Sequence, residues 1–324
     1  VLKLKDILKI LVFTSIGVGI LVFLFRRQDV SLADLWASFR TLNPLWIGLS
    51  LAGLLVSHAM RALRWRMQIE ALGHPVRTLP AFWAMMAGYA INYVVPRSGE
   101  LLKCGWLGKR EAIPPTRLVG TVVTERLIDV VCLGGVVAIA FVLEFDTLWG
   151  YLSEHATFRP TPVQIAVALS VGALGLLALF VVWRRSGESG IYSRIWEQVL
   201  HLKSGLLSIG KVRRPGMYVV LTVMIWAEYV LMHYVVMLAF APTAHLGIEV
   251  GLMVFVFGSL GIIIPTPGGI GSFQALVTQA LVLYGIQTEE AFIFSNIVFW
   301  PFVVVNIVLG TIGFLALSRK SSAL

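Results

Sequence analysis

The sequence predicts an all-α fold: a polytopic helical membrane protein with about seven full spans and two oppositely oriented re-entrant helical hairpins. The chain has 324 residues, of which 58% are hydrophobic and 13% charged, with a mean hydropathy of +0.85. Several apolar runs of roughly 20 residues are each long enough to cross a hydrocarbon core ~30 Å thick. No polar stretch is long enough for a separate domain of ~100 residues, so residues 1–324 are treated as one membrane domain.

The predicted apolar segments are separated by short polar links of very different charge. These segments lie near 7–25, 44–60, 79–96, 117–143, 162–183, 216–240, 248–264, 270–285 and 290–317. Lys and Arg collect in the links 61–78, 97–117 and 184–215, whereas 144–161, 241–247 and 286–289 hold one or none.

The basic links predict how the chain is threaded, because cytoplasmic loops of membrane proteins collect Lys and Arg. Both links around 79–110 stay in the cytoplasm if that region is a re-entrant hairpin. The second hairpin, 248–285, then enters from the opposite side. Both termini are predicted to be cytoplasmic, in the inner membrane of a prokaryote. The link 26–43 is the exception, since it is placed outside and yet carries Arg26, Arg27 and Arg40.

The link 184–215 is too polar to span the membrane. Its apolar residues recur at helical spacing, among them Ile191, Ile195, Val199 and Leu202. This pattern favours an amphipathic helix on the cytoplasmic face; a plain solvated loop is the alternative.

The turns of the two predicted hairpins share a short pattern. Residues 94–99 read Val-Val-Pro-Arg-Ser-Gly and residues 263–268 read Ile-Ile-Pro-Thr-Pro-Gly. Prolines end a helix, and an interrupted helix in lipid is tolerated only beside protein or a water-filled cavity. Broken helices at matching positions of two opposed halves are typical of inverted-repeat transporters, with the substrate between them.

The second turn carries Gly268, Gly269 and Gly271 ahead of a new helix that contains Gln274. A helix N-terminus offers unpaired N–H groups, which suit a phosphate or carboxylate. The alternative is that these glycines only permit tight helix packing. A nucleotide site is not predicted, because no Lys follows the glycines and no strand precedes them.

Ionisable residues within the predicted spans are candidates for a substrate pathway, since such groups are costly in lipid. Glu125 and Asp129 share one helix face, and we expect Arg97 to neutralise them. Arg126 is predicted to pair with Glu100. A closed structural ion-pair network is the alternative interpretation.

Glu228 lies in the middle of the segment 216–240 with no cation on the same helix face. It is a candidate proton carrier or lipid-amine contact. A hydrogen bond to a neighbouring helix is the alternative. No spacing of His, Cys, Asp or Glu predicts a metal site, and no catalytic constellation or cofactor is expected. The net charge of +9 is attributed to cytoplasmic loops and anionic lipid contacts rather than to nucleic acid.

Three motifs together resemble the lysylphosphatidylglycerol synthase transmembrane (flippase-like) family. They are Asn92-x-x-x-Pro96-Arg97-x-Gly99-Glu100, Thr124-Glu125-Arg126-Leu127-Ile128-Asp129 and Pro265-x-Pro267-Gly268-Gly269-Ile270-Gly271. The resemblance covers nearly the whole chain. It implies lipid flipping by the membrane domain, with Arg97, Glu100, Glu125, Arg126 and Asp129 as a polar core beside the glycine hairpin.

Two residues depart from what is common in that family. Lys103 stands where Arg is common, and Gln274 stands where Glu is common, which removes a charge from the second hairpin. Because the chain ends at Leu324 without a soluble aminoacyl-transfer domain, lysyl-lipid synthesis is not expected here.

The sequence therefore predicts a lipid translocase that is not an enzyme and is not driven by ATP. Membrane lipids, phospholipid or polyprenyl-linked, are the expected partners, with a homo-oligomer or a lipid-modifying enzyme as further ones. Two alternatives are a secondary transporter or channel for a small solute, and a non-transporting subunit of a lipid-modifying or glycosyl-transferring enzyme. The predicted substrate-binding residues are Asn92, Arg97, Glu100, Glu125, Arg126, Asp129, Glu228, Gly268, Gly269, Gly271 and Gln274.

Overall fold

The structure is a computed structural model that describes residues 15, 18–28, 30–95, 98–147, 149–150, 210, 212–264 and 266–318. The predicted span 162–183 and nearly all of the predicted link 184–215 lie outside these residues. The described part is helical and contains no strand, as the sequence predicts. Four of its helices are long and apolar enough to cross a membrane: α3 (Pro44–Ala71), α6 (Pro115–Leu143), α10 (Pro215–Ala239) and α13 (Thr288–Ser318).

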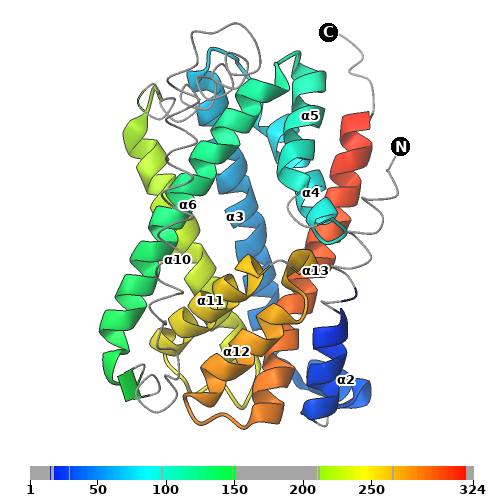
Figure 1. The fold of residues 1–324 in the computed structure, drawn as a ribbon, viewed down its shortest axis with the longest axis vertical. Coiled ribbons are helices and arrows are strands. Elements are labelled where there is room, and N and C mark those ends of the chain that lie inside the picture. The colour runs from blue at the N-terminus through cyan, green and yellow to red at the C-terminus, as the bar shows by residue number, and fades with distance from the viewer. Residues whose placement is uncertain are drawn as a thin grey trace, which may run out of the picture.

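The first half of the bundle is a long helix, a pair of short helices and a second long helix. Helix α3 is followed by α4 (Thr78–Asn92) and α5 (Gly99–Glu111), and α6 then completes the unit. In Figure 1, α3 rises to the upper end, α4 descends about halfway, α5 returns upward, and α6 runs down the full height.

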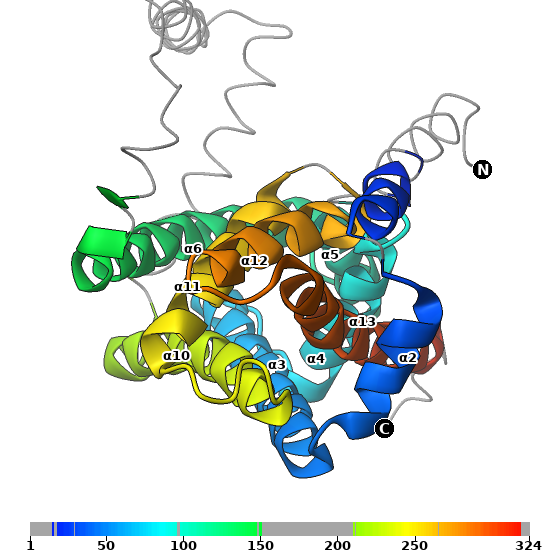
Figure 2. The ribbon, with the colours of Figure 1, turned by 90° about the horizontal axis from the view of Figure 1, so that it is seen from below.

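The second half repeats this order in the opposite sense. Helix α10 descends, α11 (Ile248–Ile263) rises to about mid-height, the one-turn η2 (Pro267–Gly269) and α12 (Ser272–Val282) return downward, and α13 rises (Figure 1). Figure 2 looks along the bundle and shows α11 and α12 among α6, α10 and α13, against which they pack. The two short-helix pairs therefore point toward each other from opposite ends.

Each half has its own hydrophobic core. The buried side chains between α3, α4, α5 and α6 include Trp65, Met85 and Leu107. A second cluster around Phe292 and Phe294 joins α10 to α13 and also receives the short α2 (Leu32–Thr41). The halves meet where α3 packs on α10 and α4 packs on α13. Gly310 and Gly313 of α13 make the second contact close, because a Cβ at either position would overlap the α4 backbone.

The outer surfaces of the long helices are apolar as well. Val131 and Val142 of α6 are each 74% exposed, and Val223 of α10 is 62% exposed. Apolar side chains at this exposure are unfavourable in water and are expected where a helix faces lipid. This arrangement agrees with a membrane protein.

The predicted link 61–78 is wrong in its first part. The stretch 61–71 is the last three turns of α3 and not a loop, so Arg64 is buried on a helix and Arg61 is half-buried beside it. The density of Arg residues led to its assignment as a link, although Arg61 and Arg64 lie beside the carboxylates of α6. The stretch 99–111 is helix α5, which agrees with a helical second arm of the predicted hairpin 79–110.

Candidate functional site

A cluster of seven charged side chains lies between α3, α5 and α6, and we call it the charged cluster. Its members are Arg61, Arg64, Glu100, Lys103, Glu125, Arg126 and Asp129. It forms because α3 presents a polar stripe with i, i+4, i+7, i+11 spacing (Ser57, Arg61, Arg64, Gln68) toward the carboxylates of α6.

Glu125 is at the centre of the charged cluster and is completely buried. Its Oε1 accepts a hydrogen bond from Arg64 Nη2 at 3.3 Å, and its Oε2 accepts one from Lys103 Nζ at 3.3 Å. Arg64 Nη2 also donates to Asp129 Oδ1 at 2.9 Å. A carboxylate desolvated in this way is stable only because several cations surround it.

Lys103 and Arg126 close the charged cluster on the side of α5. Lys103 Nζ lies 2.7 Å from Glu100 Oε2 and 4.7 Å from the centre of the Trp65 ring, a cation–π geometry. Arg126 Nη2 lies 3.3 Å from Glu100 Oε1, which confirms the predicted Arg126–Glu100 pair.

Arg61 is held mainly by aromatic residues of the other helices. Its Nη1 donates to the Tyr229 hydroxyl of α10 at 2.7 Å, and its guanidinium carbon lies 5.4 Å from the Tyr89 ring centre of α4. Its Nη2 is 3.7 Å from Glu125 Oε1 and 3.9 Å from Asp129 Oδ2. The charged cluster thus contains four cations and three carboxylates, which leaves one positive charge in excess.

The first hairpin turn is closed by the side chain of Asn92. Its Oδ1 accepts a hydrogen bond from the backbone N–H of Gly99, at 2.8 Å, and so caps the start of α5. Gly99 itself lies so close to Gly88 of α4 that a Cβ would overlap the Gly88 carbonyl. Pro96 and Arg97 lie outside the described residues. The cations that surround Glu125 and Asp129 in the described structure are Arg61, Arg64, Lys103 and Arg126, in the role that the sequence assigned to Arg97.

The second hairpin turn needs its glycines for their backbone conformation. Gly268, Gly269 and Gly271 all have positive φ, at 59°, 83° and 83°, a region that side chains with a Cβ rarely enter. The Gly271 N–H donates to Gln274 Oε1 at 2.8 Å, so this part of the α12 N-terminus is already paired. Ser272 Oγ ties the turn back to α11 by donating to the Gly261 carbonyl at 2.7 Å.

A polar chain links the second turn to the charged cluster. Gly268 lies under the ring of Tyr93, at the end of α4. Asn306 of α13 donates from Nδ2 to the Tyr93 hydroxyl at 3.2 Å, and His58 Nε2 donates to Asn306 Oδ1 at 2.8 Å. The His58 ring in turn contacts the Tyr89 ring, with centroids 5.3 Å apart. Tyr89 is the residue beneath Arg61, so this series of contacts extends from the second turn to the charged cluster without a break.

The predicted site residues, apart from Arg97, therefore fall into four places. Glu100, Glu125, Arg126 and Asp129 come together in the charged cluster. Gly268, Gly269, Gly271 and Gln274 form the opposite hairpin turn, and Asn92 lies in the first turn. Glu228 is apart from these three places: it is half-buried against Gly53 of α3 and forms no ion pair with a described residue.

The sequence analysis did not identify Arg61 and Arg64 as site residues, nor the position of Lys103 inside the charged cluster. It also did not identify the tyrosines that contact Arg61. The helical spacing of Ser57, Arg61, Arg64 and Gln68 was the signal for the two arginines. Nothing in the sequence pointed to Tyr89 and Tyr229, because their role depends on the packing of α4 and α10 against α3.

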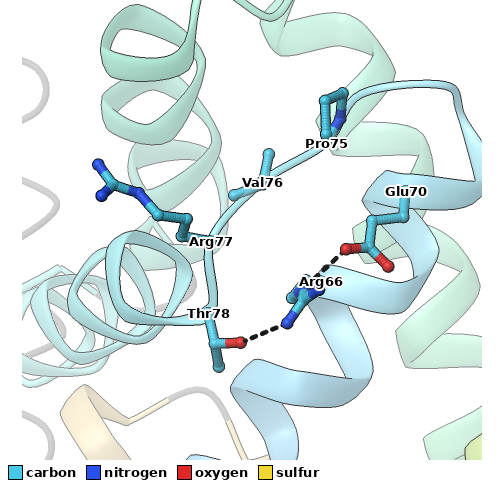
Figure 3. A pocket seen from close by; sticks show the side chains of 6 residues that line it. All are labelled: Arg66, Glu70, Pro75, Val76, Arg77 and Thr78. Atoms are coloured by element: carbon cyan, nitrogen blue, oxygen red, sulfur yellow. Dashed lines mark hydrogen bonds and ion pairs between the residues drawn. The ribbon is translucent and has the colours of Figure 1, made fainter. Parts of the chain in front are cut away.

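A pocket of about 310 Å³ opens at the upper end of the bundle, outside the charged cluster. It is lined by Arg66, Glu70, Pro75, Val76, Arg77 and Thr78. Arg66 bonds Glu70 and Thr78 across the pocket, while the Arg77 side chain points away from them (Figure 3). Among the described residues, no group of three His, Cys, Asp or Glu side chains could hold a metal ion.

The comparison with protein families agrees with the resemblance that the sequence motifs indicate. Residues 7–310 match the family model described as the lysylphosphatidylglycerol synthase TM region. Neither the curated proteins nor the solved structures give a match to this chain. The matched region is the non-catalytic membrane part of such synthases. Because the match spans most of the sequence, the chain belongs to the lysylphosphatidylglycerol synthase transmembrane family.

Proposed function

We propose that this protein is a lipid translocase that moves a polar lipid head group past the charged cluster while the lipid tails stay in the bilayer. The single observation that carries the proposal is a cluster of seven charges beside a half-height hairpin in an otherwise apolar bundle, with Arg64, Lys103 and Glu125 buried at its centre. Ionisable groups in a membrane interior are expensive and mark substrate pathways. The membrane lipid connection of the family supports the same conclusion.

The proposal treats α4–α5 and α11–α12 as re-entrant hairpins. Each enters from one end of the bundle and returns to it (Figure 1), and their turns meet where Tyr93 covers Gly268. Helices that stop at mid-depth require protein or water around their ends. A head group moving between the ends would pass this meeting point, with the charged cluster on one side of it.

The charge at the two ends supports an orientation. The links at the upper end of Figure 1 and the helix turns next to them carry Arg66, Arg77, Lys109, Arg110, Arg117, Arg213 and Arg214. Those at the lower end carry six acids, Asp34, Glu144, Asp146, Glu249, Glu289 and Glu290, together with Arg26, Arg27 and Arg40. By the positive-inside rule the upper end is cytoplasmic.

Cysteine labelling tests this orientation in intact cells after both native cysteines, Cys104 and Cys132, are replaced. A membrane-impermeant maleimide should label cysteines placed at Ala244 and Gln287 of the lower loops. Cysteines at His74 and Ala112 of the upper loops should react only after the cells are broken. The reverse pattern would reject the orientation.

The geometry indicates a role for the three carboxylates of the charged cluster. Glu100, Glu125 and Asp129 each lie within ion-pair distance of at least two cations. They are therefore assigned to holding the cations in position rather than to binding an amine. The head group is expected to contact the cations.

A flipping assay in liposomes tests the proposed function directly. Purified protein should accelerate the movement of a fluorescent phospholipid between leaflets without ATP, measured by chemical quenching of the outer leaflet. Replacing Arg64 by Gln should lower the rate at least tenfold, because Arg64 bridges Glu125 and Asp129. Arg66→Gln is the matched control, since Arg66 stands two positions away, bonds Glu70 and Thr78 and should leave the rate unchanged. Equal rates with and without protein, over several lipid classes, would reject the proposal.

A further inference from the structure

Arg61 has the longest ionic contacts of the four cations in the charged cluster. Lys103, Arg64 and Arg126 approach carboxylate oxygens to 2.7, 2.9 and 3.3 Å. The nearest carboxylate oxygens to Arg61 are at 3.7 and 3.9 Å, beyond hydrogen-bond distance. Its short hydrogen bond goes to a neutral group, the Tyr229 hydroxyl. The excess positive charge of the cluster is thus best assigned to Arg61.

One edge of the Arg61 guanidinium is free of hydrogen bonds. Tyr229 occupies Nη1 and the Tyr89 ring covers one face. The Nε and Nη2 atoms are both buried and form no hydrogen bond with a described residue. These two nitrogens lie on the same side of the guanidinium and donate in parallel, which matches two oxygens of one phosphate or carboxylate.

The electrostatics of the charged cluster favour an anion at this edge. The two carboxylates nearest to Arg61 Nη2 are shared with the other cations, so one positive charge of the cluster is not neutralised. Such a charge is unfavourable in a membrane interior, and an anion beside Arg61 would neutralise it. An amine would raise the excess to two positive charges, because the three carboxylates are already shared among the four cations. Phosphate is the anion that membrane lipids carry, and two of its oxygens fit the free edge.

We propose that Arg61 binds the phosphate of an anionic lipid head group through Nε and Nη2, with Tyr89 and Tyr229 fixing the orientation of the guanidinium. The preferred lipid is one without an amine, such as phosphatidylglycerol. The route by which the lipid arrives rests on the proposed function, whereas binding itself is measured without transport.

Binding is tested on the purified full chain in detergent by native mass spectrometry. The probes are phosphatidylglycerol, phosphatidylethanolamine, which has the same phosphate with an amine, and inorganic phosphate as a competitor. The wild type should retain phosphatidylglycerol at least tenfold more strongly than phosphatidylethanolamine. Displacement of phosphatidylglycerol by inorganic phosphate would show that the phosphate ion alone is recognised. If inorganic phosphate does not compete, the ligand is the whole lipid. Both results support the phosphate site.

Two variants test whether lipid retention depends on the paired donors of the Arg61 guanidinium or only on its positive charge. Arg61→Lys keeps the charge but lacks paired donors, so it should weaken retention of phosphatidylglycerol at least tenfold. Tyr229→Phe keeps the guanidinium and removes the group that orients it, so it should weaken retention several-fold even if Arg61 variants fold poorly. Arg66→Gln, on the same helix outside the charged cluster, should retain the lipid as the wild type does. Unchanged retention in both Arg61→Lys and Tyr229→Phe, or a preference for the amine lipid, would overturn the proposal.

The two proposals fail in different ways. If the wild type binds phosphatidylglycerol through Arg61 but does not accelerate flipping, the phosphate site stands and the translocase is rejected. If flipping proceeds at the wild-type rate in an Arg61→Lys variant that also binds normally, the translocase stands and the phosphate site is rejected.

Discussion

The ring of Tyr93, at the end of α4, packs so closely against Gly268, at the tip of the opposite hairpin, that a Cβ at position 268 would overlap it. This contact joins the two hairpin turns, which are 175 positions apart in the sequence. Gly268 has no side chain to keep the ring away, and its φ of 59° is one that glycine adopts without strain. The meeting of the two turns therefore depends on one residue type at one position.

Replacing Gly268 by Ala should destabilise the protein through two separate effects. The new Cβ would overlap the Tyr93 ring, and a non-glycine residue at positive φ costs about 1–2 kcal/mol. Gly285 is a matched control, because its φ is also positive, at 80°, but no atom lies within 4 Å of its Cβ position. Thermal unfolding in detergent should show a larger loss for Gly268→Ala than for Gly285→Ala. Equal losses would mean that the Tyr93 contact is unimportant.

Replacing Glu125 by Gln should be among the most damaging single changes in the chain. It removes the central carboxylate and leaves Arg64 and Lys103 with uncompensated buried charge, at an expected cost of about 3–5 kcal/mol. Glu70→Gln is the control, since the Glu70–Arg66 pair is about one-third exposed and such pairs contribute about 0–1 kcal/mol. The two variants are compared by their free energies of unfolding, or by the temperatures at which half of the monodisperse protein is lost.

A double substitution refines that prediction. Lys103→Met in the Glu125→Gln background removes one of the stranded cations and should recover part of the lost stability. Additive losses in the double-mutant cycle would contradict an energetic link between these two residues.

Replacing Asn306 should lower the stability of the protein more than replacing an exposed polar residue of the same helix. Asn306→Leu would leave both His58 Nε2 and the Tyr93 hydroxyl without their partner, and each buried unpaired group costs about 1–3 kcal/mol. Thr311→Val, on the same helix, removes only an exposed hydroxyl that bonds its own backbone. A thermal shift that is no larger for Asn306→Leu than for Thr311→Val would argue against the polar chain.

Glu228 should behave differently from Glu125. It is half-buried against Gly53 and has no ion pair with a described residue, so Glu228→Gln should leave stability within about 0.5 kcal/mol or raise it. If Glu228 carries protons during transport, the same variant should abolish the dependence of the flipping rate on a pH gradient. A wild-type gradient response in folded Glu228→Gln would exclude that role.

Much of the candidate site could be predicted from residue patterns along the chain. The i, i+4 spacing of Glu125 and Asp129 places both on one helix face, and the Pro-Gly turns predicted two interruptions of apolar segments. The pairing of Arg126 with Glu100 also followed from helix geometry. The neutralising cations could not be predicted, because the density of Arg residues near 61–78 was interpreted as a loop. Arg61 and Arg64 in fact lie on α3, where Arg64 is buried and Arg61 is half-buried.

The sequence by itself determined that this chain is a bundle of apolar helices with costly polar residues at specific positions, since hydrophobicity, proline and glycine act locally. Only the tertiary structure decided which charges meet. The ends of Arg and Lys side chains reach several ångströms from the backbone, so their partners depend on how α3, α5 and α6 cross. It also decided that α3 continues to Ala71, that Tyr93 lies over Gly268, and that Tyr89 and Tyr229 hold Arg61 with two donors unpaired. Each of these is a contact between distant segments, and local pattern carries no information about it.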